Sequence, residues 1–396
     1  MSSKLAPIPT EKLVVNIGPS HPVTHGTLRI QCELDGETIV RSACEIGYLH
    51  RGFEKQSEGV FYEHVIPYTE RLNYMGPVQN SNAWCYAVEQ MLGIEAPPRA
   101  QAIRVITSEM GRITDHCVCA AANFVDLGGL TNFWYLVRYR ERMLDLYEEL
   151  CGARMMVNYP RIGGVSLDTP DGWLEKLRKE MEQLEPMLAD VRGLVARNRI
   201  VLDRTQGVCP ISQEDALNFG MTGPCLRATG IPYDLRKVQP YWGYDQYDFE
   251  VITRENGDTY DRIMLRFDEM EQSRRIILQA IDSIPDGPVM VDDPKVALPH
   301  KDLVYNTMEG LINHFKLVMH GTDVPAGEYY SATEGSNGEL GFYIISDGGP
   351  KPYRVRIRPP CFMNYSAFPS MINGSMVADL VAALGSINVI AGELDR

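Results

Sequence analysis

The pattern of hydrophobic positions changes twice along the chain, from strand-like to helical and back. Residues 12–17 form an apolar run, and apolar residues alternate with polar ones over 28–34, before the pair Asp35-Gly36 and a second run over 37–44. Alternation with a period of two is typical of a half-buried strand. An Asp-Gly pair between two such runs predicts a tight hairpin in which both turn residues take positive φ.

A helical period begins at about residue 61. After Pro97-Pro98, apolar residues recur at steps of three and four, at Ile103, Ile106, Met110, Ile113, Cys117 and Ala120. This spacing describes one apolar face of a helix about six turns long. The same period predicts four more helices, over residues 132–151, 170–199, 266–282 and 301–315. Gly152 is expected to end the first of these four.

The strand pattern returns towards the end of the sequence. Strands are expected over 340–346 and 353–358, on either side of a turn at 347–350, and a last helix over 376–384. Strands, then a long helical middle, then strands again predict an α+β fold. In this fold a multi-helical bundle packs on a β-sheet layer formed from the N-terminal and C-terminal segments.

This order also suggests three parts of the chain. Residues 1–60 would be a β-rich segment, and residues 61–335 a mainly helical bundle. Residues 336–396 would form a β hairpin, a helix and a tail. We expect no internal repeat and no low-complexity linker between the parts.

The composition is that of a folded globular protein, with 44% hydrophobic and 23% charged residues. The chain has 38 basic and 52 acidic residues, which gives a formal net charge of -14 at pH 7. The two signs are not segregated along the sequence. Such a charge opposes binding to a phosphate backbone or to an anionic lipid surface, so nucleic acid is disfavoured as a partner.

Cysteine usage and the apolar segments predict a reduced, cytoplasmic protein. The nine cysteines are an odd number without the spacing of a disulfide framework, and residues 1–10 contain no apolar signal segment. The most apolar long stretches, 117–137 and 376–394, are interrupted by Asp126 and Asp379, so neither is expected to cross a membrane. If the protein works with a membrane, it must dock on another protein that crosses it.

The sequence lacks the short motifs that hold metals and nucleotides. It contains no C-x-x-C, no P-loop, no G-x-G-x-x-G between a strand and a helix, and no H-E-x-x-H. Cys117 and Cys119 would point in different directions on a helix, and core packing explains them better than a metal site does. We therefore expect this chain to bind no cofactor and any redox cofactors to lie on other chains.

Histidines suited to proton transfer lie in the loop 18–26, where prolines and glycines restrict His21 and His25. The alternative is that one or both histidines only bond loop carbonyls. Asp126 is a carboxylate in apolar company at the end of a predicted helix. It would be either a turn residue or a partner that orients a histidine, because buried acids need partners.

A second group of polar side chains follows in the sequence. Arg51 lies in the segment 47–55, and Arg71 and Tyr74 lie shortly after it. Taken alone, the arginines are explained by a solvated charged face, and Tyr74 by amphipathic packing.

Taken together, these segments resemble the D subunit family of bacterial respiratory complex I, the proton-translocating NADH:quinone oxidoreductase, whose mitochondrial counterpart is the 49 kDa subunit. The resemblance covers essentially the whole chain. Its matches follow in order at residues 21–26, 46–55, 98–129, 161–165, 223–237, 338–341, 346–349, 352–354, 385–387 and 395–396. The family is related to the large subunit of nickel-iron hydrogenases, and the resemblance implies that fold.

The resemblance implies a core subunit of the peripheral arm that forms the quinone-reduction cavity with a neighbouring B subunit. By family motif, His25 and Tyr74 fall at the positions that hydrogen-bond the quinone head group, and Asp126 at the position that pairs with the histidine. Ile390 falls at the cavity wall. These residue types suit the reaction, because a reduced quinone carries charge on oxygens that His and Tyr donors can stabilise and protonate.

The cofactors and partners follow from the same resemblance. The terminal 4Fe-4S cluster would lie on the B subunit, with Arg51 and Arg71 close to it, where positive charge favours its reduced form. Quinone would be the substrate, and this chain would hold no cofactor and be inactive alone. The implied partners are the B and C subunits and the membrane subunit that forms the quinone channel. The resemblance places the chain on the cytoplasmic face of the cell membrane as a peripheral protein.

Two other functions compete with this one. Hydrogenase large subunits hold their metals with two C-x-x-C pairs, at places where this chain reads 71–76 and 390–393 without any cysteine. Without thiolates the nickel and iron cannot be held, so hydrogenase activity is disfavoured. A purely structural scaffold for cluster-bearing subunits is the other alternative, and the presence of His25, Tyr74 and Asp126 argues against it.

The sequence departs from the family pattern at two places. Asn388-Val389 stands where the family usually has Asp-Pro, next to Ile390. Met156 stands where many members have a histidine two residues after an arginine, here Arg154. A thioether cannot titrate, so we expect the cluster of the neighbouring subunit to lack a titrating imidazole at this position.

Overall fold

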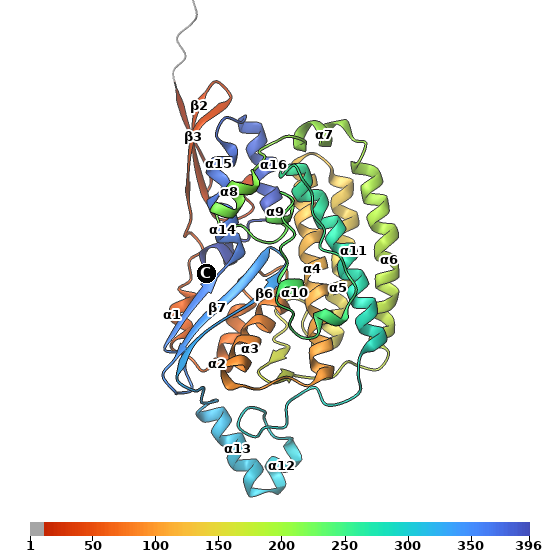
Figure 1. The fold of residues 1–396 in the computed structure, drawn as a ribbon, viewed down its shortest axis with the longest axis vertical. Coiled ribbons are helices and arrows are strands. Elements are labelled where there is room, and N and C mark those ends of the chain that lie inside the picture. The colour runs from red at the N-terminus through yellow and green to blue at the C-terminus, as the bar shows by residue number, and fades with distance from the viewer. Residues whose placement is uncertain (1–11) are drawn as a thin grey trace, which may run out of the picture.

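The computed structural model describes residues 12–396 and contains a bundle of long helices flanked by two antiparallel sheets (Figure 1). The bundle consists of α4 (Pro98–Asp126), α5 (Leu130–Cys151), α6 (Trp173–Val195) and α11 (Thr259–Ser283). Each of these four helices packs against at least two of the others. The predicted α+β class is therefore confirmed.

The sequence signals explain where the bundle helices begin and end. Pro98 opens α4, since a proline at the first helical position needs no backbone partner, and the predicted apolar stripe of α4 is buried. Gly152 ends α5 with φ of 81°, as expected. Helix α11 begins seven residues before the predicted start, because the Asp258 side chain accepts a hydrogen bond from Asp261 N at 2.8 Å and caps it.

The N-terminal sheet has the order β1-β2-β3, with β1 at Leu13–Ile17, β2 at Arg29–Asp35 and β3 at Thr38–Glu45. The predicted hairpin is confirmed, but its conformation differs from the expectation. Asp35 pairs with Thr38, so the turn residues are Gly36 and Glu37, and of these only Gly36 has positive φ, at 62°. Asp35 remains a strand residue.

The second large sheet has the order β6-β7-β8, with β6 at Gly327–Gly335, β7 at Gly338–Ser346 and β8 at Arg354–Arg358. Strand β6 was not predicted, and its hairpin with β7 spans the expected boundary between residues 335 and 336. The two ends of the chain form separate sheets rather than one. They meet where β3 runs beside residues 374–377, with an isolated bridge between Thr38 and Met376.

The remaining elements are short, apart from α3. The helices are α1 (Phe53–Ser57), α2 (Tyr62–Thr69), α3 (Pro77–Leu92), α7 (Arg199–Thr205), α8 (Gln213–Asn218), α9 (Pro224–Arg227), α10 (Leu235–Val238), α12 (Lys301–Asn306), α13 (Met308–Met319), α14 (Pro360–Ser366), α15 (Phe368–Ile372), α16 (Val377–Ile387) and α17 (Ala391–Asp395). Strands β4 (Pro160–Arg161) and β5 (Gly164–Val165) form a small hairpin, and η1 (Pro22–Thr24) and η2 (Tyr244–Gln246) are 3-10 turns.

The helix predicted over 301–315 is wrong in one respect, because the structure divides this region into α12 and α13. Thr307 ends α12 in an extended conformation, and its side chain accepts a hydrogen bond from Gly310 N at 3.1 Å, which caps α13. Figure 1 shows this helical pair projecting from the body of the protein.

Buried apolar residues form three clusters. The largest fills the helical bundle, and another lies between α3 and the sheet β6-β7-β8. The C-terminal cluster joins the N-terminal sheet to helices α14–α17 and includes Ile390 and Leu394, with Val23 and Tyr74 packed against it. The C-terminal cluster thus places residues from three distant parts of the sequence next to one another.

Candidate functional site

His25 and Asp126 contact each other directly. His25 follows η1 with φ of 51°, and its Nε2 lies 2.5 Å from Oδ2 of Asp126 at the end of α4. About a fifth of each side chain is exposed, 20% for His25 and 18% for Asp126. A carboxylate in this position orients the imidazole and stabilises its charged form.

The loop that carries His25 is held from within. The buried Thr24 donates from Oγ1 to the carbonyl oxygens of His21 and Gly26, both at 2.7 Å. His21 is exposed, and its Nδ1 accepts a hydrogen bond from Val23 N at 3.2 Å. Of the two loop histidines, His21 therefore serves the turn, and His25 faces the carboxylate.

The tail of the chain packs against this loop and against the segment that carries Tyr74. A side chain on Gly26 would place its Cβ 3.0 Å from Cβ of Ala391. A side chain on Gly392 would approach the carbonyl oxygens of Arg71 and Leu72 to 2.6 and 2.8 Å. Only glycine fits at such close backbone contacts. The loop 21–26, the segment 71–74 and the tail therefore meet at one place.

Tyr74 is partly buried and packs against the C-terminal cluster, which also contains Ile390. Burial raises the pKa of the Tyr74 hydroxyl, and the nearby Cys361 and Asp115 raise it further, while Arg51 opposes them. A raised pKa keeps the hydroxyl protonated. Tyr74 can therefore act as a hydrogen-bond donor to a ligand that enters beside it.

Arg51 joins the Tyr74 segment to the tail. Its Nη2 donates to the carbonyl oxygens of Arg71 at 2.8 Å and of Gly392 at 3.0 Å. Burial and the charge of Arg71 both lower the pKa of Arg51. The Arg71 side chain is exposed and donates to the carbonyl of Pro67, so its positive charge is available at the surface.

The segment 47–51 also holds the tail. The carboxylate of Asp395 accepts hydrogen bonds from Gly47 N at 2.9 Å and from Leu49 N at 2.7 Å. His50 Nδ1 lies 2.8 Å from the carbonyl oxygen of Asp395. The motif of residues 46–55 and the final Asp395-Arg396 pair are therefore parts of a single structural unit.

Met156 lies half-buried in the loop between α5 and β4. This loop meets the residue that precedes Arg71, because Asn158 N donates to Oε1 of Glu70 at 2.5 Å. Glu70 is fully buried, its Oε2 has no hydrogen-bond partner, and burial raises its pKa to about 7. The sequence reasoning missed Glu70, although it immediately precedes a residue singled out there.

Glu393 is a second buried carboxyl group that the sequence reasoning missed. Its two oxygens accept hydrogen bonds from Cys361, at 3.2 Å from the backbone N and 3.3 Å from Sγ. Burial raises the pKa of Glu393 to about 7. Its place two residues after Ala391, in the tail expected to line the cavity, was the only signal in the sequence.

Asn388 explains the effect of one departure from the family pattern. Its Nδ2 donates to Oδ2 of Asp115 at 2.9 Å and to Oδ1 of Asn337 at 2.6 Å, and its backbone is left-handed with φ of 59°. An aspartate at this position would set a second carboxylate against Asp115. The asparagine instead donates to it, so the departure removes a negative charge below Ile390.

Three features of the described residues concern metals, disulfides and membranes. Within residues 12–396, no three His, Cys, Asp or Glu side chains gather in a way that could hold a metal ion. All nine cysteines lie in this range and are free. No helix in the same range is long and apolar enough to cross a membrane.

Comparisons with known proteins agree with the geometry. Residues 126–396 match the family model described as respiratory-chain NADH dehydrogenase, 49 Kd subunit. The D subunit of NADH-quinone oxidoreductase from Myxococcus xanthus is 49% identical, with 99% of this chain and 94% of the relative covered. The D subunit from Geobacter sulfurreducens is also 49% identical, with 98% and 99% covered.

A third relative is longer than this chain. The C/D subunit of NADH-quinone oxidoreductase from Bdellovibrio bacteriovorus is 50% identical over 97% of this chain, which spans 69% of that relative. Matches of this identity and coverage show the family. The chain therefore belongs to the 49 kDa subunit family of respiratory-chain NADH dehydrogenases, the D subunits of NADH-quinone oxidoreductase.

Proposed function

We propose that this chain forms the quinone-reduction cavity of a proton-translocating NADH:quinone oxidoreductase, together with a neighbouring B subunit that holds the terminal 4Fe-4S cluster. The observation that carries this proposal is the 2.5 Å contact between His25 and Asp126. It supports a histidine kept ready to give a proton, beside a tail and a tyrosine of the same cavity. Ile390, packed in the C-terminal cluster with Tyr74, would form part of the cavity wall.

Reduction of a quinone to a quinol adds two electrons and two protons, one proton to each carbonyl oxygen. The cluster of the neighbouring subunit supplies the electrons. Nε2 of His25 is occupied by Asp126, so Nδ1 is the nitrogen left to face the substrate. The charged imidazole would give its Nδ1 proton to one oxygen and remain bonded to Asp126 through Nε2–H.

Tyr74 would serve the second carbonyl oxygen. Burial keeps its hydroxyl protonated, so it can donate to the charge that develops as the quinone is reduced. Arg51 would act indirectly, because its two hydrogen bonds fix the tail against the Tyr74 segment. Arg71, exposed beside it, would place positive charge towards the cluster. Met156 would lie on the same side, joined to this segment through Asn158 and Glu70.

The partners and location are proposed on the same basis. The B and C subunits and the membrane subunit of the quinone channel would surround this chain on the cytoplasmic face of the cell membrane. The relative named as a C/D subunit, in which the two letters belong to one chain, supports a close association with the C subunit. We retain the division into residues 1–60, 61–335 and 336–396, with the first and last parts lining the cavity.

A photoreactive quinone tests this function against that of a structural scaffold. The labelled quinone is added to the intact enzyme, and the peptides that carry label are identified by mass spectrometry. Label on peptides containing Tyr74, His25 or Ile390, lost on competition with unlabelled quinone, supports the cavity. Label confined to other subunits, with none on this chain, would favour the scaffold.

A further inference from the structure

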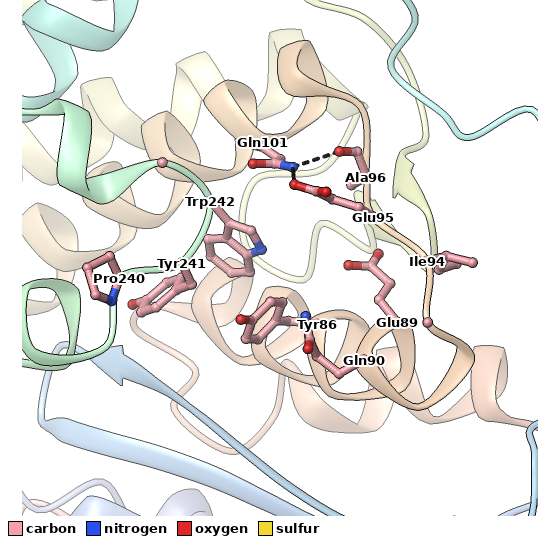
Figure 2. Close-up of a pocket in the computed structure, with 12 residues that line it drawn as sticks. Tyr86, Glu89, Gln90, Ile94, Glu95, Ala96, Gln101, Pro240, Tyr241 and Trp242 are labelled. Carbon is pink, nitrogen blue, oxygen red and sulfur yellow. Dashed lines mark hydrogen bonds between the residues drawn. The ribbon is translucent and has the colours of Figure 1, made fainter.

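A pocket of about 480 Å³ lies at the opposite end of α4 from Asp126 (Figure 2). Its walls come from the end of α3, the residues 93–96 that follow, the start of α4 and residues 240–243. Gln101, which lines it, lies 25 positions before Asp126 on the same helix, or roughly 38 Å away at 1.5 Å per residue. The pocket is therefore separate from the candidate quinone site.

Three aromatic rings form one wall. The ring centroids of Tyr86 and Tyr241 lie 5.6 and 4.8 Å from that of Trp242, both in edge-to-face geometry. Trp242 is 8% exposed, and its indole N–H has no hydrogen-bond partner. Figure 2 shows this nitrogen directed towards the space between Glu89 and Glu95. A buried donor without an acceptor is unfavourable, so a ligand that brings an acceptor gains from binding here.

The opposite wall is acidic. None of the twelve lining residues is Lys, Arg or His, whereas Glu89 and Glu95 both line the space. Glu89 is neutralised from behind by Arg104, at 2.5 and 2.8 Å. Glu95 is exposed and has one hydrogen bond, from Gln101 Nε2 at 3.0 Å. Its charge remains for a ligand, so the pocket favours a cation beside the rings.

The surface next to the pocket is strongly apolar. Ile94 lines both the pocket and a groove of about 820 Å³ that continues along α13. The outer side of α12 and α13 exposes large apolar side chains, at Leu303 51%, Tyr305 81%, Met308 73%, Leu311 50%, Ile312 44%, Phe315 63%, Val318 50% and Met319 63%. A patch of this kind on a projecting pair of helices marks an interaction site rather than a solvated surface.

We propose that this end of the chain is the docking surface for another subunit of the enzyme, which inserts an arginine into the pocket and covers α13 with apolar residues. A guanidinium can lie on the aromatic wall and pair with Glu95, while a carbonyl of the same peptide accepts from the Trp242 N–H. A second copy of this chain is disfavoured by its net charge of -14, as is an anionic lipid surface.

Photo-crosslinking of the intact enzyme tests this surface. A benzophenone amino acid replaces Gln90, an exposed residue at the pocket, and the cross-linked peptides are sequenced. We expect one peptide of another subunit, containing an arginine near the linked residue. Cross-links only to a second copy, to lipid or to a peptide without a basic residue would overturn the proposal, as would no cross-link at all.

Charge reversal supplies the second measurement. Glu95→Lys should lower the yield of that cross-link about tenfold or more, because like charges would meet in the pocket, and Glu95→Gln should lower it less. Asp203→Lys is the matched control, an exposed carboxylate on α7 that forms a surface ion pair with Arg199, and should leave the yield unchanged. Changing the partner's arginine to glutamate should restore the cross-link in Glu95→Lys. An unchanged yield in Glu95→Lys would contradict the proposal.

Discussion

Nε2 of His25 and Oδ2 of Asp126 lie 2.5 Å apart although 101 positions separate the two residues in the sequence. The contact joins a loop that precedes the second strand of the N-terminal sheet to the last turn of the longest helix. The orientation of the imidazole therefore depends on how the N-terminal sheet is seated on the bundle. A substitution on either side of this contact should act on the same step of quinone reduction.

The first prediction compares the two members of the pair. His25→Ala should strongly reduce quinone reduction in the assembled enzyme, because a proton donor is lost. Asp126→Asn should reduce it less, since the amide oxygen still accepts from Nε2–H but no longer stabilises the charged imidazole. Steady-state turnover with a soluble quinone measures both. Equal losses would show that Asp126 does more than hold the histidine.

A second prediction concerns the close contact of the tail with residues 71 and 72. Gly392→Ala should displace the tail and lower quinone reduction, because the new Cβ would meet the Arg71 and Leu72 carbonyl oxygens at 2.6 and 2.8 Å. Gly193→Ala is the matched control, since that glycine lies near the end of α6 with open space around it. The control should keep full activity and stabilise the chain by roughly 0.5–1 kcal/mol in thermal unfolding. Full activity in Gly392→Ala would contradict the packing described.

Much of the fold was predictable because the long helices bury apolar faces. The stripe from Ile103 to Cys117 identified α4, and Gly152 identified the end of α5. Helix α3 was not predicted because the buried side of its first half is polar, with Gln79, Asn80 and Asn82 bonding to other elements. Periodicity of apolar residues cannot reveal such a helix.

The candidate site was predictable only in part. The resemblance pointed to His25, Asp126 and Tyr74, and the structure places each beside the tail or the loop that the resemblance implied. Glu70 and Glu393 could not be found in this way, because each owes its raised pKa to burial by segments distant in sequence. Burial of a single polar residue leaves no periodic signal in the sequence.

A third prediction follows from the pKa of Glu70. Burial raises this pKa from 4.5 to about 7, so the protonated carboxyl is the form that the fold favours. The resulting stability is fully present below about pH 4.5 and is lost as the pH rises through about 7. A shift of this size corresponds to at most about 3 kcal/mol. Urea unfolding of the purified chain between pH 5 and 8 measures it.

Glu70→Gln should flatten that pH dependence, because the amide cannot ionise. Glu149→Gln, at an exposed ion pair with Lys176, is the control and should leave the pH profile as it is. If Glu70→Gln shows the same decline in stability between pH 5 and 8 as the unmodified chain, the decline belongs to other groups.

A fourth prediction concerns Met156 and the proposed cluster of the neighbouring subunit. A thioether does not titrate, so Met156→His should make the cluster potential depend more steeply on pH, between about pH 6 and 8, than in the unmodified enzyme. A histidine there binds a proton more readily once the cluster is reduced. Redox titration followed by electron paramagnetic resonance at several pH values measures the slope.

Glu70 provides the control for that experiment, since it also titrates near neutral pH and contacts Asn158 in the same loop. The increase in slope caused by Met156→His should persist when Glu70 is replaced by glutamine. An identical slope with and without the new histidine would place Met156 too far from the cluster to matter.

Quinone reduction by Tyr74→Phe in the assembled enzyme tests the proposed cavity most directly. The substitution removes one hydroxyl and keeps the ring that packs against the C-terminal cluster. Cluster reduction by NADH should be unchanged, whereas quinone turnover should fall by a factor on the order of 100, the usual cost of losing one donor to a developing oxyanion. Unchanged turnover with a normally reduced cluster would contradict the assignment of the quinone site to this chain.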